Sequence, residues 1–237
     1  MSILRFYTAD LMQCSQVLQL ANAIRKDLQQ TGNDALHALI NNAGCVRSWY
    51  MTNEAGYEQQ FALNHLAGYL LTHALLPCLQ KGAGLVIMTG SQSRWGARVH
   101  WNDVMLRHRY NPLTAYKQSK LCNLLFAKGL NDRCAALGIH AYVVDPGLVH
   151  TDIGDKAAGI AKLVWRFRKN HGVSPLIPAQ TYAFLCAQPH PLPGLYYRQN
   201  HPQPYSKQVT TENANLLFAL SQQLCGATFG EEARPCT

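Results

Sequence analysis

The sequence has no long hydrophobic run, no CxxC pair and no dense stripe of basic residues. No stretch approaches the roughly 20 apolar residues that cross a bilayer, so we predict no signal peptide and no membrane segment. The 8 cysteines are irregularly spaced, which is typical of a reducing compartment. His65 and His73 have no suitably spaced carboxylate or cysteine beside them, so no metal site is predicted. These absences indicate a cytoplasmic chain.

The charge and composition exclude further classes of protein. Lys and Arg outnumber Asp and Glu by 21 to 13, a formal net charge of +8, but the basic residues are scattered. Nucleic-acid binding requires a concentrated basic surface and is therefore not predicted. With 48% hydrophobic and 14% charged residues, the chain is typical of one globular domain, which we expect to span residues 1–237.

Short apolar runs alternate with segments of helical spacing along the chain. Extended segments are predicted at residues 4–8, 38–41, 85–88 and 139–144. Helices are predicted at residues 16–30, 58–79 with a break at Pro77, and 114–136. This alternation predicts an α/β fold with a parallel sheet covered by helices on both faces.

Polar and Gly-containing turns follow three of these strands directly. They are Asn41–Gly44, Thr89–Ser91 and Pro146-Gly147. Ligands of such sheets bind outside the carboxyl ends of the strands. One site is therefore predicted where these three turns meet.

Tyr116 and Lys120 stand four residues apart on a predicted helix, so both side chains lie on one face. A phenol has an ordinary pKa near 10, and a cation beside it lowers that pKa until the phenol can act as an acid or base. Taken alone, the pair is weak evidence for a site, because such spacing recurs by chance and favours an ordinary surface helix. Ser91 at a strand end and Asn64 on the helix after NNAG add a hydroxyl for a substrate oxygen and an amide for a water.

At this point the chain resembles the short-chain dehydrogenase/reductase family, within its retinol dehydrogenase-like and WW-domain oxidoreductase-like branch. The resemblance implies a Rossmann-type doubly wound parallel sheet. Its motifs occur in the family's order, and they are NNAG at 41–44, LNHLAGYLLTHALLP at 63–77, AYKQSKLCNLLFAKGL at 115–130, VVDPGLVHTDIG at 143–154, SPLIPAQTYAFL at 174–185, GLYY at 194–197 and the closing helix around Ala214–Cys225.

The resemblance also implies roles for individual residues. Tyr116 would exchange a proton with the substrate oxygen, Lys120 would bind the nicotinamide ribose and lower the pKa of Tyr116, Ser91 would orient the carbonyl, and Asn64 would order a relay water. The cofactor would contact ten positions, namely Asp10, Asn42, Ala43, Gly44, Tyr116, Lys120, Pro146, Gly147, Val149 and Thr151.

Two features depart from the family's pattern. The usual serine pair is replaced by Thr89-Gly90-Ser91-Gln92-Ser93, in which Ser91 is preferred and Ser93 is the alternative. The Gly-rich TGxxxGxG turn that receives the pyrophosphate is absent from these residues. We therefore expect a fold truncated at the N-terminus, without its first βαβ unit, and with one edge of the fourth family strand exposed.

The resemblance predicts an NAD(P)-dependent oxidoreductase that interconverts an alcohol and a ketone or aldehyde. The expected cofactor is NADP, with NAD as the alternative, and the expected substrate is a hydrophobic small molecule of retinoid, steroid or lipid type. A homodimer is compatible with this reading, as is membrane association through a missing N-terminus. The alternative is a catalytically inactive, truncated protein that acts through protein contacts.

Overall fold

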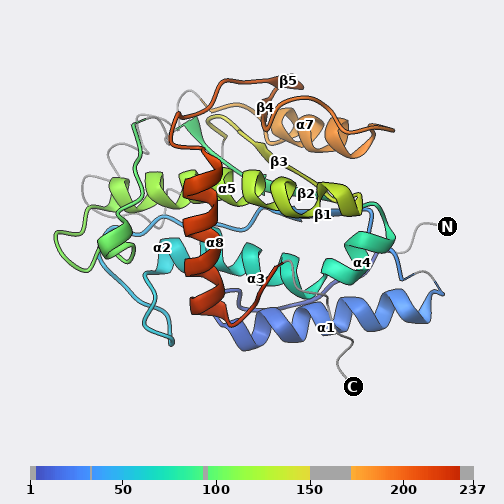
Figure 1. Cartoon of the computed structure of the whole chain (residues 1–237), viewed down its shortest axis with the longest axis horizontal. Helices are drawn as coiled ribbons and strands as arrows, with labels where there is room; N and C mark the ends of the chain where they lie inside the picture. The colour runs from blue at the N-terminus through green and yellow to red at the C-terminus, as the bar shows by residue number, and fades with distance from the viewer. Residues whose placement is uncertain (1–3, 33, 93–95, 150–171, 230–237) are drawn as a thin grey trace.

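The computed structural model describes residues 4–32, 34–92, 96–149 and 172–229. Helices and strands alternate through most of this part of the chain (Figure 1). In order, the elements are α1 (Cys14–Gln30), β1 (Ala38–Asn41), α2 (Gln59–Phe61), the π-helical turn η1 (Ala62–Leu66), α3 (Ala67–Ala74), α4 (Leu76–Lys81), β2 (Leu85–Thr89), the 3₁₀ turn η3 (Trp101–Asp103), α5 (Pro112–Cys134), the 3₁₀ turn η4 (Ala135–Leu137), β3 (His140–Val144), α7 (Leu176–Cys186), β4 (Tyr196–Arg198), β5 (His201–Pro202) and α8 (Thr211–Cys225).

The strands form one sheet in the order β1-β2-β3-β4-β5. The first four are parallel, and the short β5 is antiparallel to β4. In the register, Ile87 on β2 pairs with Ile40 on β1 and with Tyr142 on β3. The predicted α/β fold with a mostly parallel sheet is therefore confirmed, and the antiparallel β5 is an addition that the sequence pattern did not indicate.

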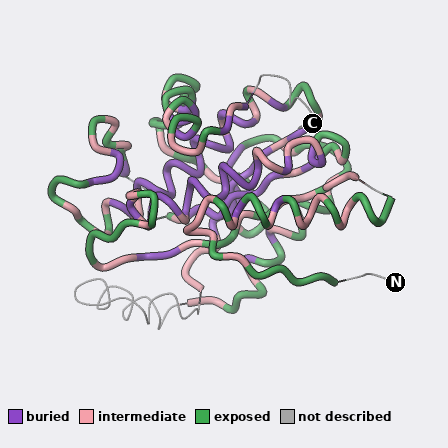
Figure 2. Tube along the Cα trace, turned by 90° about the horizontal axis from the view of Figure 1, so that it is seen from below, coloured by how far each residue is buried: buried purple, intermediate pink, exposed green. Residues whose placement is uncertain are grey.

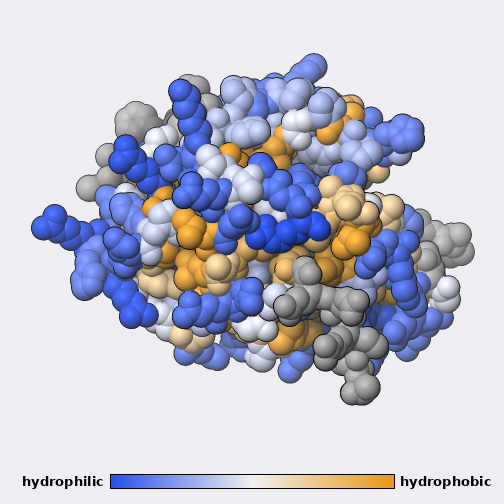
Figure 3. All heavy atoms as spheres, viewed as in Figure 1, coloured by the Kyte–Doolittle hydropathy of each residue, from blue (hydrophilic) through white to orange (hydrophobic). Residues whose placement is uncertain are grey.

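One face of the sheet carries the larger part of the core. Helix α5 lies across this face, and α3, α1 and α8 pack around it (Figure 1). The side chains of Leu121, Leu124, Leu125 and Phe126 on α5 are 0% exposed, and buried segments concentrate in the middle of the molecule (Figure 2). Hydrophobic residues on the surface of this side gather near the middle of the view, with hydrophilic ones around them (Figure 3).

Among the described residues, one helix packs on the opposite face. Helix α7 packs on β3 and β4, where Leu185 joins a small core with Ile87, Tyr142 and Tyr197. On β1 the side chain of Ile40 is 43% exposed, and among the described residues no strand pairs with the outer edge of β1. Helices therefore lie on both faces of the sheet, as the pattern predicted, and among the described residues the cover on this face reaches β3 and β4.

Two predicted elements differ in detail. Residues 4–8 form no strand. Leu4 and Phe6 are 78% and 86% exposed, and no strand of the described residues pairs with this segment. The helix predicted at residues 58–79 is divided into α2, η1, α3 and α4. Its break falls at Leu75 because Pro77 occupies the first turn of α4, where its missing N–H costs nothing.

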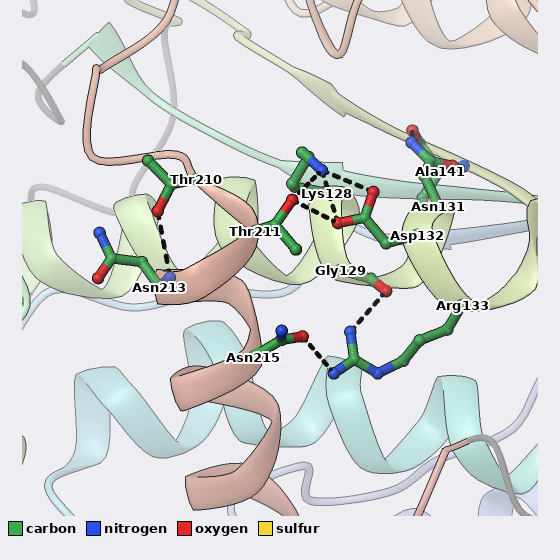
Figure 4. A network of polar contacts seen from close by, with 10 residues as sticks. All are labelled: Lys128, Gly129, Asn131, Asp132, Arg133, Ala141, Thr210, Thr211, Asn213 and Asn215. Carbon is green, nitrogen blue, oxygen red and sulfur yellow. Dashed lines mark hydrogen bonds and ion pairs between the residues drawn. The ribbon is translucent and has the colours of Figure 1, made fainter.

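Helix α8 is attached to α5 by polar contacts as well as by the core (Figure 4). Lys128 Nζ donates to Asp132 Oδ1 at 2.6 Å and to Thr211 Oγ1 at 2.9 Å. Arg133 donates to Asn215 Oδ1 at 2.7 Å, and its guanidinium lies 4.1 Å from the centre of the Phe218 ring.

In the described part of the chain, no helix is both long and apolar enough to span a bilayer.

Candidate active site

A pocket of about 480 Å³ opens at the carboxyl ends of β1, β2 and β3, where the sequence predicted a site. Its walls come from the turns after these strands, from α5 and from α7. The lining residues are Ile40, Asn42, Gly44, Cys45, Thr89, Gly90, Tyr116, Lys120, Pro146, Gly147, Val149, Pro175, Pro178, Ala179 and Tyr182.

Tyr116 and Lys120 reach the pocket from the first turns of α5. This helix begins at Pro112, and Asn111 caps it by accepting a hydrogen bond from the Thr114 backbone N–H at 2.9 Å. The cap fixes the start of the helix and hence the face on which Tyr116 and Lys120 lie. The ammonium of Lys120 is 5.7 Å from the centre of the Tyr116 ring, close enough to stabilise a phenolate electrostatically.

Lys120 is buried in the wall of this pocket. Its side chain is only 4% exposed, and Nζ donates to the Thr89 carbonyl oxygen at 3.0 Å. Burial lowers the pKa of Lys120 to about 8 because water no longer solvates the ammonium, and the nearby Cys45 thiol partly opposes that shift. Lys120 is therefore mainly cationic at neutral pH and loses its charge in mildly alkaline solution.

Asn64 lies behind the pocket, in the π-helical turn η1. Its amide oxygen accepts from the Cys45 backbone N–H at 2.7 Å, and its amide nitrogen donates to the Cys45 carbonyl at 3.1 Å and to Ser119 Oγ at 2.9 Å. Both amide hydrogens thus have protein partners, and the side chain braces the turn after β1 against α5. This contact pattern differs from the water-binding amide that the sequence suggested.

Gly44 makes this arrangement possible. A Cβ atom at residue 44 would lie 3.0 Å from Asn64 Oδ1 and 3.5 Å from Lys120 Nζ. Any side chain there would enter the space between the amide and the ammonium. The glycine of the NNAG motif therefore keeps the pocket wall open next to Lys120.

The end of β2 explains the departure from a serine pair. A Cβ at Gly90 would lie 2.6 Å from Val143 Cγ1 and 3.0 Å from the Tyr196 ring, so a serine at residue 90 would collide with the core. Ser91 follows directly and is partly buried. Gly90 lines the pocket, whereas Ser91 is not among the lining residues. Ser93, the alternative to Ser91, lies outside the described residues.

The pocket contains some of the predicted cofactor-binding residues but not all of them. Those that line it, besides Tyr116 and Lys120, are Asn42, Gly44, Pro146, Gly147 and Val149. Ala43 instead lines a neighbouring cavity of about 70 Å³ together with Leu11. Asp10 is exposed beside Leu11, where Oδ1 accepts from the Met12 backbone N–H at 3.0 Å. Thr151 lies outside the described residues.

Tyr182 is a residue of the pocket that the sequence reasoning missed. Tyr182 projects from α7, and its hydroxyl lies 2.8 Å from Thr89 Oγ1. The segment at 174–185 was recognised only as part of the resemblance, because neither the spacing nor a motif within it marks a site residue. Only the packing of α7 against the strand ends brings this phenol to the pocket.

The fold and the site now define a class of protein. The family model described as short chain dehydrogenase matches residues 2–159. The chain is 35% identical over 165 residues to retinol dehydrogenase 12 of Mus musculus, covering 68% of this chain and 52% of that protein. It is 34% identical over 164 residues to retinol dehydrogenase 14 of Homo sapiens, covering 65% and 47%. The chain belongs to the short-chain dehydrogenase family.

A solved structure agrees with this assignment. A protein from Mycobacterium paratuberculosis, itself uncharacterized, superimposes with a TM-score of 0.70 at 29% identity, covering 93% of this chain and 75% of that one. This chain spans about half the length of the curated relatives it matches.

Proposed function

We propose that the chain is the catalytic portion of an NAD(P)-dependent oxidoreductase that interconverts an alcohol and a ketone or aldehyde. The observation that carries this proposal is the Tyr116–Lys120 pair on α5, with the buried ammonium of Lys120 beside the phenol in a pocket at the strand ends. A surface helix would leave both side chains in water. Here the low-polarity surroundings strengthen the effect of the cation on the phenol.

The residues present fit the nicotinamide end of such a cofactor. Gly44 leaves open space next to Lys120, and Pro146, Gly147 and Val149 line the same pocket. Lys120 and Asn42 would hold the ribose and adjoining oxygens. The bound nicotinamide would supply the hydride chemistry, while residues 1–237 contain no Gly-rich turn to hold the pyrophosphate.

The residues of the chain would then manage the proton and the substrate. During alcohol oxidation, the phenolate of Tyr116 would take the proton of the substrate hydroxyl while the hydride leaves the carbon that bears this hydroxyl. During carbonyl reduction, Tyr116 would return the proton to the substrate oxygen. Lys120 would stabilise the phenolate, and Ser91 would orient the substrate oxygen. From its contacts, Asn64 would act by holding the turn at Cys45 against α5.

The finer assignments follow from the resemblance and from the lining of the pocket. We propose NADP as the cofactor and a hydrophobic substrate of the retinoid class, in keeping with the retinol dehydrogenases among the relatives. Ile40, Val149, Pro175 and Ala179 give the pocket apolar walls, which suit such a substrate. The alternative proposal is an inactive chain that acts through protein contacts.

Cofactor binding and turnover separate these two proposals. The purified 237-residue chain is titrated with NADPH, followed by fluorescence, and its conversion of all-trans-retinal to retinol is measured by chromatography. We expect saturable binding, and we expect Tyr116→Phe to lower turnover roughly a hundredfold or more with NADPH affinity unchanged within about twofold. Tyr205→Phe, which alters a tyrosine outside the pocket, serves as the control and should keep wild-type turnover.

Two results would contradict the enzymatic proposal. No saturable binding at millimolar NADPH would favour the inactive alternative for this chain. Undiminished turnover in Tyr116→Phe would remove the phenol from the reaction.

A further inference from the structure

Three polar side chains from distant segments meet on one side of the pocket. Thr89, at the end of β2, donates from Oγ1 to Asn42 Oδ1 at 3.0 Å. The Tyr182 hydroxyl on α7 lies 2.8 Å from Thr89 Oγ1 and 3.5 Å from Asn42 Oδ1. The amide oxygen of Asn42 therefore faces two hydroxyl groups.

The hydrogen bonds of this group have a defined direction. Thr89 donates its single hydroxyl hydrogen to Asn42 Oδ1, which can only accept. The hydrogen between the two hydroxyls must then come from Tyr182. Burial raises the pKa of Tyr182 to about 12, with Thr89 partly opposing the shift, so this phenol remains a donor at neutral pH.

This chain of donors fixes the amide of Asn42. With Oδ1 held by the hydroxyls, Nδ2 and its two hydrogens point the other way. Asn42 is exposed and lines the pocket, and Nδ2 has no hydrogen-bond partner among the described residues.

Thr89 also connects this group to the proposed catalytic pair. Its backbone carbonyl oxygen accepts from Lys120 Nζ at 3.0 Å and from Asn123 Nδ2 at 3.0 Å. Thr89 thus contacts Asn42 through its side chain and Lys120 through its backbone. Tyr182 on α7 contacts the same Thr89 side chain.

We propose that Tyr182 is a positioning residue that, through Thr89, presents the Asn42 amide hydrogens to an acceptor oxygen of the dinucleotide, either a ribose hydroxyl or a phosphate. This inference rests on the proposed cofactor-binding function. Tyr182 acts through Asn42 and makes no contact with the reacting atoms. Its loss should therefore weaken cofactor binding and leave the chemical step largely unchanged.

A double-mutant cycle tests this role. NADPH affinity is measured for the wild-type chain, Tyr182→Phe, Asn42→Ala and the double variant, and retinal turnover is measured at saturating NADPH. We expect Tyr182→Phe to weaken NADPH binding roughly five- to tenfold, the effect of about one hydrogen bond. In the Asn42→Ala background the same substitution should have no further effect.

Tyr142→Phe is the matched control. Tyr142 belongs to the same small core as Tyr197, but its hydroxyl donates to the Leu192 carbonyl at 2.9 Å, away from this pocket. We expect Tyr142→Phe to keep the wild-type NADPH affinity. An equal loss of affinity from Tyr182→Phe with and without Asn42 would indicate a general packing effect and would overturn the inference.

The remaining outcomes separate this inference from the proposed function. Wild-type NADPH affinity in Tyr182→Phe overturns the inference alone. A chain that binds NADPH, shows the coupling to Asn42 and yet converts no retinal overturns the proposed activity alone. A wild-type chain that does not bind NADPH overturns both, because no dinucleotide is then available to Asn42.

Discussion

His65 is a fully buried imidazole in the turn η1. Its Nε2 lies 2.8 Å from Ser221 Oγ on α8, and Nδ1 has no partner within the described residues. The aromatic rings of Phe61, Tyr69 and Phe126 surround it. Because burial withdraws the imidazolium from solvent, the pKa of His65 is lowered to about 3.

This pKa predicts an acid-sensitive fold. Between about pH 6.5 and pH 3 the unfolded chain binds a proton that the folded chain excludes, so the stability present above pH 6.5 is lost as the pH falls. At pH 5 the loss from this residue is about 2 kcal/mol. Urea unfolding at pH 7.5 and pH 5 should show this drop, and His65→Gln, which does not titrate, should show less of it. An identical pH dependence in the variant would contradict the assignment to His65.

At the scale of elements, Asn131 joins α5 to the start of β3. The parallel partner β4 begins opposite Val143, so the backbone of Ala141 meets no strand on that side. The Asn131 amide takes the place of a strand, accepting from the Ala141 N–H at 2.7 Å and donating to its carbonyl at 2.9 Å (Figure 4). A side chain thus completes the hydrogen bonding of β3.

Removal of this amide should weaken the attachment of α5 to the sheet. We expect Asn131→Ala to lower the free energy of unfolding by about 1–3 kcal/mol, because a backbone donor and acceptor of β3 lose their partners. Chemical denaturation monitored by circular dichroism measures the change. Asn215→Ala, at an exposed contact with Arg133, is the control and should change stability by less than about 0.5 kcal/mol. Equal effects of the two variants would contradict the account.

At the scale of the whole molecule, the two edges of the sheet differ. On the β4 side the antiparallel β5 follows the parallel strands. On the other side β1 pairs only with β2 among the described residues, and Ile40 is exposed beyond the cover of α7. An open strand edge next to an exposed apolar side chain favours pairing with other chains.

The β1 edge predicts self-association that depends on protein concentration. We expect Ile40→Lys to reduce the association measured by light scattering, because a charge at an edge strand opposes pairing between sheets. Leu216→Lys, which places the same charge at an exposed position of α8, should have little effect. Equal reductions by both variants would point to net charge instead of the β1 edge.

Much of this architecture was predictable because it depends on local patterns. The strand at Ala38–Asn41 agrees with its predicted range, and α5 begins two residues before the range predicted for it, since apolar periodicity and Asn or Pro punctuation act over a few residues. The irregular segment at residues 4–8 was not foreseen. A strand also needs a neighbour, and a pattern within one segment does not say whether that neighbour is present.

The candidate site likewise has a part that local sequence patterns predict and a part that only packing sets. The sequence by itself determined the positions of Tyr116, Lys120 and Gly44, since helical spacing and the NNAG turn are encoded in contiguous residues. Only the tertiary structure decided that Asn64 holds the turn at Cys45, that core side chains exclude a Cβ at Gly90, and that Tyr182 reaches Thr89. The physical reason is that these contacts join segments far apart in the chain, where packing and hydrogen-bond geometry select the partners.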